Sequence, residues 1–545
     1  MDRDPRLATD QTVLTARASA MPVSPLRAAS LVGILAVGLG AFGLLDSVRQ
    51  NPAFQWSFFG ASGLLLVWSG AVFGAARRIG RPLTLEVAVR PQHLVQALAQ
   101  LTFLAYWGWY WRPVYDAAFL IAAQLIFAYA FDMLLSWSRR QTYSLGFGPF
   151  PVIFSINLFL WFADDWFYLQ FLLIGLGFAA KELIRWDKDG RRVHIFNPSS
   201  FPLAVFAVAL ILTGTSDLTW GQDIAATQFF PPHVYLVLFL VALPGQYLFG
   251  VASMTMSAVV VTYVFGLLYF SVTGVYFFYD SYVPIAVFLG MHLLFTDPST
   301  APRTQMGRLL FGVGYGLSTV ALYAVLSRAG VPPFYDKLLQ VPLLNLSIQW
   351  LDRLARSTSL RTIVPADSGR GLTGRGRHLA STAVWAGVFA LMSALQAVGD
   401  HHPGQGVPFW QTACDEGRSS ACEYLAGLQR RYCDSGSGWA CNEVGRVARD
   451  RLVGNDAFRR GCDLGFESAC LNLTRLAAGR EPVAFAHAPP TLTDYPIILR
   501  GTKGPIVDRS PEVLRARACR QGWADACERL APIDDGGRNS DNASP

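Results

Sequence analysis

The first 413 residues of this chain contain no cysteine, and charged residues make up only 15% of its 545 positions. Little charge beside 52% hydrophobic residues leaves far more apolar surface than one globular core can bury. The chain also lacks a phosphate-binding glycine loop, a nucleophile elbow and an H-E-x-x-H helix, so no motif of those reaction classes is present. Lipid is therefore the expected solvent for most of the chain.

Apolar segments long enough to cross a hydrocarbon core recur between Leu31 and Leu351. The clear segments are 27–45, 57–75, 94–112, 117–136, 166–180, 253–272, 282–296 and 308–326. Four others, 148–162, 199–213, 233–250 and 335–351, are shorter or interrupted by proline, and a last one, 378–397, follows a polar interval. The predicted fold class is all-α, with a polytopic transmembrane bundle of about 11–13 spans. Glycine-rich stretches such as Leu31–Gly43 and Gly312–Gly316 predict close helix packing.

The distribution of basic residues predicts an orientation. Lys and Arg gather before the first span, after the second, fourth, sixth and tenth, and before the last, whereas 46–53, 163–165, 214–232 and 273–281 carry almost none. By the positive-inside rule, the N-terminal tail 1–26 is cytoplasmic and the first span is an uncleaved anchor. We expect a multi-pass inner (plasma) membrane protein whose partner is the bilayer, and the net charge of +7 reflects topology instead of nucleic-acid binding.

The cysteines provide an independent test of that topology. All 8 form pairs of identical spacing, each with Gly three residues after the first Cys and Ala just before the second: Cys414 with Cys422, Cys433 with Cys441, Cys462 with Cys470, and Cys519 with Cys527. The spacing predicts a turn between two helices, with glycine ending one helix and Ser420, Ser468 or Asp525 capping the next. Disulfides across these turns require an oxidising, extracytoplasmic compartment. Zinc is the alternative, but closed zinc sites usually use closer pairs, so we predict no metal.

The segments Ala413–Gly417 with Ala421–Leu425, and Gly461–Gly465 with Ala469–Leu473, resemble the cysteine-rich Sel-like repeats, relatives of the tetratricopeptide solenoids. The resemblance covers about 405–533, with a tail at 534–545, and implies helical hairpins that bind an extracytoplasmic protein or ligand. A purely structural cap is the alternative. An arginine-rich linker, 352–377, and a final tether, 378–398, connect this region to the membrane domain 27–351.

Two membrane segments resemble a family of flavin-bearing subunits. They are His194–Phe201, which reads H-I-F-N-P-S-S-F, and Phe295–Gly312, which begins F-T-D-P-S-T-A-P-R. The family, called RnfD/NqrB-like, comprises the flavin-bearing membrane subunits of Rnf-type electron transport complexes and of the sodium-translocating NADH:quinone reductase. Weaker matches are Leu243–Gln246 and Asn345, so the resemblance spans about 100–350. It implies a redox subunit with a flavin or quinone and sister subunits.

The resemblance and the chemistry of the segments together give the candidate cofactor-binding residues: Asn197, Thr227, Thr296, Asp297, Arg303 and Arg308. Thr296-Asp297-Pro298 should end a helix at the membrane face, and the two arginines could meet a phosphate or carboxylate. A helix-ending turn held by an Asp–Arg contact is the alternative. In the family, a Thr of a Ser-Gly-Ala-Thr type motif carries covalent FMN; here Asp223–Gln228 keeps Ala-Thr227 but lacks Ser and Gly, which argues against covalent attachment.

Asp132 lies inside an otherwise apolar predicted span, and His292 is the only histidine deep in a clear one. Asp132 could serve a proton or ion path or a buried helix contact, and His292 is expected to be packed instead of haem-bound because it has no evident partner. The functional hypotheses are therefore a redox membrane subunit, a transporter on the same scaffold, and a membrane-anchored interaction protein without redox chemistry.

Overall fold

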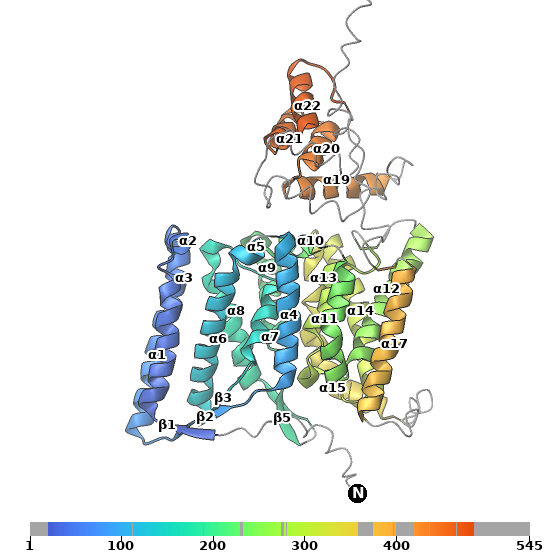
Figure 1. Ribbon diagram of the computed structural model, residues 1–545. Coiled ribbons are helices and arrows are strands. Elements are labelled where there is room, and N and C mark those ends of the chain that lie inside the picture. Colours follow the sequence, from blue (N-terminus) through green and yellow to red (C-terminus); the bar gives the residue numbers. More distant parts are fainter. Residues whose placement is uncertain are drawn as a thin grey trace, which may run out of the picture. The chain divides into compact units, whose positions relative to one another are not determined.

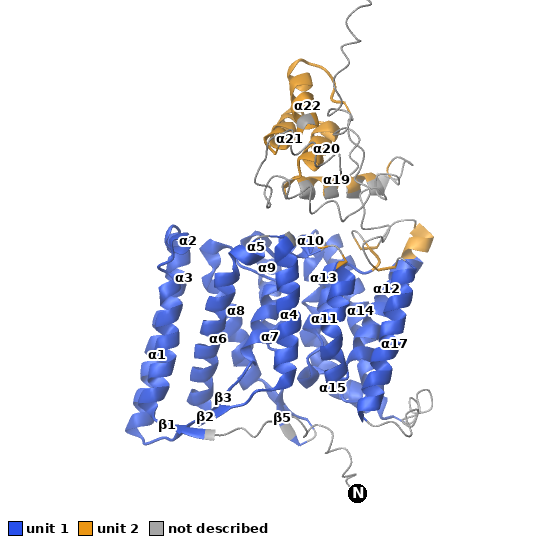
Figure 2. Cartoon of the chain, in the orientation of Figure 1, with its two compact units in different colours: residues 1–229, 234–268, 283–395 blue, residues 230–233, 269–282, 396–545 orange. Residues whose placement is uncertain are grey.

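A computed structural model describes residues 20–111, 113–188, 190–228, 231, 233–273, 277–278, 281–357, 374–395, 397–398, 414, 419–434, 437–464 and 466–483. The chain divides into two compact units (Figure 2). Unit 1 comprises residues 1–229, 234–268 and 283–395, and unit 2 comprises 230–233, 269–282 and 396–545. The predicted tail 534–545 and most of the linker 352–377 lie outside the described residues.

Helices make up most of unit 1 (Figure 1). Among the described helices, five are long and apolar enough to cross a membrane: α1 (Pro25–Phe42), α3 (Pro52–Arg78), α6 (Ala118–Arg139), α12 (Ala252–Thr273) and α14 (Gln305–Arg328). The other main helices are α4 (Pro91–Tyr110), α7 (Pro149–Asn157), α8 (Tyr168–Leu183), α9 (Ser200–Thr213), α11 (Val234–Phe249), α13 (Ile285–Leu289) continuing into η4 (Gly290–Leu294), α15 (Gln340–Ala355) and α17 (Gly374–Ala394). Each predicted span contains a helix, and the five long helices make the chain a membrane protein, while the number of crossings stays a prediction.

Five short strands within the described residues depart from the all-α prediction. In one sheet β2 (Leu83–Val87) pairs antiparallel with β1 (Ala20–Val23) and parallel with β3 (Thr142–Leu145). The second sheet is a hairpin of β4 (Arg185–Lys188) and β5 (Arg191–His194). Both sheets lie at one end of unit 1, which we call the strand end; the short helix α10 (Gly221–Thr227) lies at the opposite, α10 end (Figure 1). The strands pair backbone groups of segments that connect helices.

The central helices follow one another in two successive runs of opposite direction. The first run is α4, α6, α7, α8 and α9, which starts at the strand end; the second is α11, α12, α13–η4, α14 and α15, which starts at the α10 end (Figure 1). The third member of each run is short: α7 has 9 residues, and α13 and η4 have 5 each. Gln100 of α4 joins these two short members. Its Nε2 donates to Ser155 Oγ of α7 at 2.6 Å and to the carbonyl of Leu293 in η4 at 3.5 Å.

Local sequence explains the interruptions and the close helix contacts. Gly250 ends α11 with a φ of +64°, which glycine adopts without strain, and α12 starts two residues later. The predicted close packing at Gly312 and Gly316 is confirmed, because a Cβ on Gly312 would lie 2.1 Å from the carbonyl of Met254. On α1 the prediction is confirmed only in part: Gly40 faces Ser62, whereas Gly33 and Gly38 have no neighbour within 4 Å.

Four helices form the described core of unit 2: α19 (Ser419–Asp434), α20 (Gly438–Val447), α21 (Arg451–Asp463) and α22 (Glu467–Ala477). Three of the four predicted disulfides are present, Cys414–Cys422, Cys433–Cys441 and Cys462–Cys470. Two of them join the end of one helix to the start of the next, as the spacing predicts.

The fourth predicted disulfide is not tested by the structure. Both of its cysteines, Cys519 and Cys527, lie outside the described residues, as does the predicted cap Asp525. The bridge between Cys519 and Cys527 therefore stays a prediction from the repeated spacing alone.

The helix caps of unit 2 differ in part from the prediction. The predicted cap Ser468 is wrong, because Phe466 precedes α22 without a side-chain cap. Ser437 instead caps α20, where its hydroxyl accepts from the N–H of Ala440 at 3.1 Å. The serine directly before a helix therefore forms the cap, whereas Ser468 lies inside its helix.

Buried side chains hold these helices together. The ring of Phe458 on α21 lies against Gly445 on α20, where an added Cβ would be 2.7 Å from it. Asn472 Nδ2 donates to Asn442 Oδ1 at 3.0 Å between α22 and α20. The amide of Asn472 also exchanges two hydrogen bonds with the backbone of Val483, which fixes the segment after α22. The described part of unit 2 is thus a small helical stack stabilised by disulfides and buried amide groups.

Candidate functional site

The most specific resemblance segment begins where η4 ends. Thr296 Oγ1 donates to the carbonyl of His292 at 2.8 Å, which ends the helical turn. Asp297 then caps the 3₁₀ turn η5 (Pro298–Thr300) by accepting from the N–H of Ser299 at 3.0 Å. Pro298 suits the first position of this turn because it has no N–H to satisfy. The predicted helix end at Thr296-Asp297-Pro298 is therefore confirmed.

The carboxylate of Asp297 is surrounded by hydrogen-bond donors from its own loop and from β5. Ser299 Oγ lies 2.7 Å from both carboxylate oxygens, and Thr300 Oγ1 donates to Oδ2 at 3.2 Å. His194 Nε2 lies 2.9 Å from Ser299 Oγ and 3.7 Å from Asp297 Oδ2. Burial alone would raise the pKa of Asp297, but the nearby imidazole of His194 and the hydrogen-bond donors of Ser299 lower it to about 2. Asp297 is therefore a partly buried anion at neutral pH.

This arrangement of Ser, His and Asp is not a nucleophilic triad. The single hydroxyl proton of Ser299 goes to the Asp297 carboxylate, so the Nε2–H of His194 donates to Ser299 Oγ. A nucleophilic serine instead needs a base that takes its proton and a third group behind that base. The three side chains therefore connect the loop to the β4–β5 hairpin without activating Ser299.

Asn197 and Asn345 connect two further segments to this loop. Asn197 Oδ1 accepts from the backbone of Ser199 and Ser200 at the start of α9, at 2.9 and 3.2 Å, and its Nδ2 donates to the carbonyl of Leu294 at 2.9 Å. Asn345 on α15 accepts from the N–H of Asn197 at 3.1 Å and donates to the carbonyl of Thr300 at 3.2 Å. The structure thus brings together three of the four segments that carry the resemblance, whereas Leu243–Gln246 lies inside α11. We call His194, Asn197, Asp297, Ser299, Thr300 and Asn345 the polar cluster.

The two candidate arginines lie next to the polar cluster, and the guanidinium of Arg308 binds the protein's own backbone. Arg308 donates to the carbonyl of Pro302 at 3.0 Å and to that of Gly250 at 2.5 Å, so it joins the loop to the interruption between α11 and α12. The backbone N–H of Arg303 donates to both oxygens of Asp352 at 3.0 and 3.1 Å. The carboxylate near these residues is therefore Asp352 of α15, which sequence reasoning did not identify.

Lys188 was also missed. Its Nζ donates to the carbonyl of Ala301 at 3.0 Å, and only 6% of the residue is exposed. A lysine in a charged hairpin gives no sequence signal for such burial. Ser299 and Thr300 had a signal, because hydroxyl residues directly after Asp-Pro commonly bond back to the Asp side chain. Asp132 lies on α6, where its charge interacts with those of Lys181 and Arg140, and the structure does not place it in the polar cluster.

Thr227 lies away from the other candidates, on α10 at the opposite end of the unit. Its Oγ1 donates to the carbonyl of Asp223 in its own helix at 2.8 Å, and only 4% of the residue is exposed. Attachment of a phosphate group requires a hydroxyl that reaches solvent. The geometry of Thr227 therefore does not fit covalent flavin attachment, in agreement with the missing Ser and Gly of the motif.

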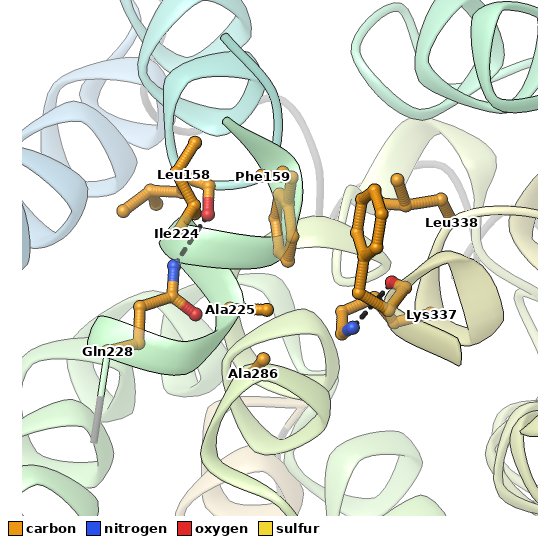
Figure 3. Close-up of a pocket in the computed structure, with 10 residues that line it drawn as sticks. Leu158, Phe159, Ile224, Ala225, Gln228, Ala286, Lys337 and Leu338 are labelled. Carbon is orange, nitrogen blue, oxygen red and sulfur yellow. Dashed lines mark hydrogen bonds between the residues drawn. The ribbon is translucent and has the colours of Figure 1, made fainter. Parts of the chain in front are cut away.

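A small hollow lies beside α10 (Figure 3). It holds about 180 Å³ of space that includes open solvent, and its lining is mostly apolar: Leu158, Phe159, Gly221, Ile224, Ala225, Gln228, Ala286, Phe334, Lys337 and Leu338. Gln228 Nε2 donates to the carbonyl of Leu158 at 2.6 Å, and Lys337 donates to that of Phe334 at 2.5 Å (Figure 3). Lys337 also pairs with Asp336 at 3.1 Å. The polar groups that line the hollow largely bond to other groups of the protein. The hollow and the polar cluster therefore do not form one site.

Among the described residues, no group of three or more His, Cys, Asp or Glu side chains is arranged to hold a metal ion. Comparisons with family models, curated proteins and solved structures find no match to this chain. The resemblances to the flavin-bearing subunits and to the Sel-like repeats therefore stay predictions.

Proposed function

We propose that this chain is a membrane subunit of a redox or electron-transport system, related to the flavin-bearing subunits that it resembles, and that it binds a flavin or a quinone without a covalent bond. The observation that supports this proposal is the polar cluster. Asn197 is 97 positions from Leu294 and 148 positions from Asn345, yet hydrogen bonds join all three segments in one place. Residues that carry the resemblance thus form one structural element instead of scattered matches.

The proposal includes an orientation. The arginine distribution and the cysteine pairs favour a cytoplasmic N-terminus and an extracytoplasmic unit 2 in the inner membrane. A membrane-impermeant thiol reagent, applied to intact spheroplasts after mild reduction, should label the cysteines of unit 2. Labelling that requires lysis would place unit 2 in the cytoplasm.

Unit 2 is proposed to be a Sel-like repeat region that binds an extracytoplasmic protein, such as a sister redox subunit. Support comes from its disulfide-bonded helix pairs and from the exposed apolar side chains Val447, Leu452 and Val453 near the α20–α21 connection. A pull-down with the full chain, compared with a chain that ends before residue 405, tests this role. Equal recovery of partners by both chains would assign the binding to the membrane domain.

A transporter is the second candidate, and the two runs of opposite direction favour it. Many transporters consist of inverted repeats with interrupted helices whose ends meet near the membrane centre. Here the short helices α7 and α13–η4 lie side by side through Ser155 and Leu293. A buried amide network lies next to them, in which Gln124 accepts from Asn157 at 2.8 Å and from Gln170 at 3.3 Å. Substrate flux into proteoliposomes without a redox partner would favour this candidate.

The decisive experiment for the redox proposal is a cofactor analysis of detergent-purified protein by absorbance and mass spectrometry. We expect a flavin or quinone in the wild type and a lower occupancy per mole in Asp297→Asn and Asn197→Ala. Asp132→Asn is the matched control, because it makes the same change from a carboxyl to an amide in unit 1 but lies outside the polar cluster. Absence of flavin, quinone and haem from the wild type would contradict the redox proposal, whereas unchanged occupancy in Asp297→Asn would return the loop to a structural role.

A further inference from the structure

The short helix that leads to the polar cluster changes its winding before it ends. Residues Gly290–Leu294 form a π-helical turn after the α-helical residues Ile285–Leu289. A π turn is less favourable than an α turn and persists only where surrounding contacts favour it, often near functional sites. The contacts around η4 therefore decide whether this turn exists.

His292 lies at the middle of the π turn, buried next to three aromatic rings. The residue is 2% exposed, and its Nδ1 lies 2.7 Å from the carbonyl of Phe288. The ring centroid of His292 lies 4.0 Å from that of Phe288 on the same helix and 6.4 Å from that of Phe239 on α11. The third ring is Trp385 of α17, whose centroid is 6.0 Å away. The enclosure thus depends on three helices, and one of them is α17.

Helix α17 makes a second aromatic contact in the same place. Phe389 stacks on Phe239 with centroids 4.0 Å apart and rings within 4° of parallel, and it also lies 6.1 Å from Phe288. Trp385 and Phe389 are 0% and 4% exposed, whereas Val384 and Leu391 of the same helix are 56% and 59% exposed. One face of α17 is therefore packed into unit 1 against α11 and η4.

The first turn of α17 packs against the turn between α11 and α12. The ring of His378 lies so close to Gly250 that an added Cβ would be 2.3 Å from its Nε2. Arg308 binds the carbonyl of the same glycine. Helix α17 thus contacts the turn between α11 and α12 as well as the π turn, which a simple tether for unit 2 has no need to do.

A direct connection leads from His292 to the polar cluster. The carbonyl of His292 accepts from Thr296 Oγ1, and Asp297 follows immediately. Conversion of the π turn to an α turn would change the helix by one residue and rotate every following position by about 100°. Thr296 and Asp297 would then leave the positions in which the polar cluster forms.

We propose that α17 holds the π turn of η4 in register through Trp385 and Phe389, which are positioning residues for Thr296 and Asp297. The rings of Trp385 and Phe389 fill the space beside His292 and Phe288. In an α-helical register the side chains of η4 would point in other directions and would not fit these rings. The part of the inference that concerns cofactor occupancy rests on the proposed function, whereas the part that concerns the register of η4 does not.

The test is backbone hydrogen exchange of the full chain in nanodiscs. We expect the amides of residues 290–296 to exchange at least about tenfold faster in Trp385→Leu/Phe389→Leu than in the wild type. The amides of α6, on the other side of unit 1, should keep their wild-type rates. Leu391→Ala is the matched control, since it shortens an exposed side chain on the same helix and should leave residues 290–296 unchanged.

A conservative variant separates positioning from general stability. Trp385→Phe retains an aromatic ring and removes Nε1–H, which has no hydrogen-bond partner among the described residues. We expect it to keep wild-type exchange at 290–296 when Phe389 is intact. Equal acceleration in all helices, or none at 290–296, would overturn the proposal. If exchange responds as expected but purified protein carries no flavin or quinone, the proposed function fails and the positioning role of α17 stands.

Discussion

The backbone N–H of Asn197 donates to the side-chain oxygen of Asn345 at 3.1 Å, although the two residues are 148 positions apart. The same Asn345 side chain donates to the carbonyl of Thr300, so one amide group joins the start of α9 to the loop after η4. Both partners are backbone groups buried away from water, and a buried backbone group that loses its partner costs free energy. Asn345 therefore determines how these two loops fit together.

We expect Asn345→Leu to lower the free energy of unfolding by about 1–3 kcal/mol, because it leaves the N–H of Asn197 and the carbonyl of Thr300 without partners. Thermal unfolding in detergent measures the change. Gln349→Leu is the control: Gln349 also lies on α15, and its amide donates to the carbonyl of Asp187 at an exposed position. An equally large loss in Gln349→Leu would show that α15 is merely sensitive to substitution.

The lowered pKa of Asp297 predicts a pH dependence. Because its pKa falls from the ordinary value of 3.8 to about 2 on folding, its ionised form stabilises the protein above about pH 4. This contribution, about 2 kcal/mol, is lost as the pH falls from about 4 toward 2. Asp297→Asn keeps an oxygen for the N–H of Ser299 but lacks the titrating group. We expect the difference in unfolding midpoint between wild type and variant to shrink from about pH 6 to about pH 3, and a constant difference would contradict the assignment.

Alanine substitutions at Gly250 and Gly80 distinguish two costs of an added methyl group: a strained left-handed backbone and a clash with a neighbouring side chain. Both have a positive φ, +64° and +62°, but only Gly250 of these two has a neighbour, the ring of His378, in the way of a Cβ. Gly80→Ala should cost about 1–2 kcal/mol for the left-handed backbone alone, and Gly250→Ala clearly more. Thermal unfolding of Gly250→Ala/His378→Ala provides the check, since removal of the ring should bring the added cost close to that of Gly80→Ala. Equal costs for the two single variants would mean that α17 does not pack on Gly250.

The disulfide between Cys433 and Cys441 should stabilise unit 2 locally. Replacement of both cysteines by serine should destabilise the α19–α20 pair by roughly 2–3 kcal/mol, by the chain-entropy relation for a short loop. Limited proteolysis of the full chain should then cut faster within 419–477, while α6 and α14 remain protected. Unchanged cleavage with and without a reducing agent would indicate that the bridge does not form in solution.

Local sequence patterns predicted the helices well. The sheet and the π turn could not be predicted, because they depend on contacts between residues far apart in the chain. Every predicted apolar segment contains a helix because length and composition are local properties. The alternation in Leu83–Val87, L-T-L-E-V, carried a strand signal, but its partners lie about 60 residues away on either side, so composition alone could not identify the sheet. The π turn at His292 gave no signal, since the rings that enclose it include Trp385, nearly 100 positions later.

The candidate site shows the same division. The cap of Asp297 on Ser299 follows from residue types two positions apart, and the sequence predicted the helix end correctly. The meeting of Asn197 with Asn345 was not predicted, because the resemblance identified the two residues separately and no periodicity relates them. Thr227 lies at the α10 end, as expected from its place in 214–232, a connection almost free of Lys and Arg, whereas Arg303 and Arg308 follow a span on the basic side.

The sheet formed by β1, β2 and β3 has a consequence for the insertion of the chain. Its three strands share one end of unit 1, with α1 and α3 between the first two and α4 and α6 between the second and third. Each pair of helices must therefore enter and return. If an insertion error left one pair incomplete, one strand would be separated from its partners by about 30 Å of hydrocarbon, and those partners would expose unpaired backbone. Closure of the sheet thus selects for correct threading of the N-terminal helices, because only a chain whose helix pairs both return can form it.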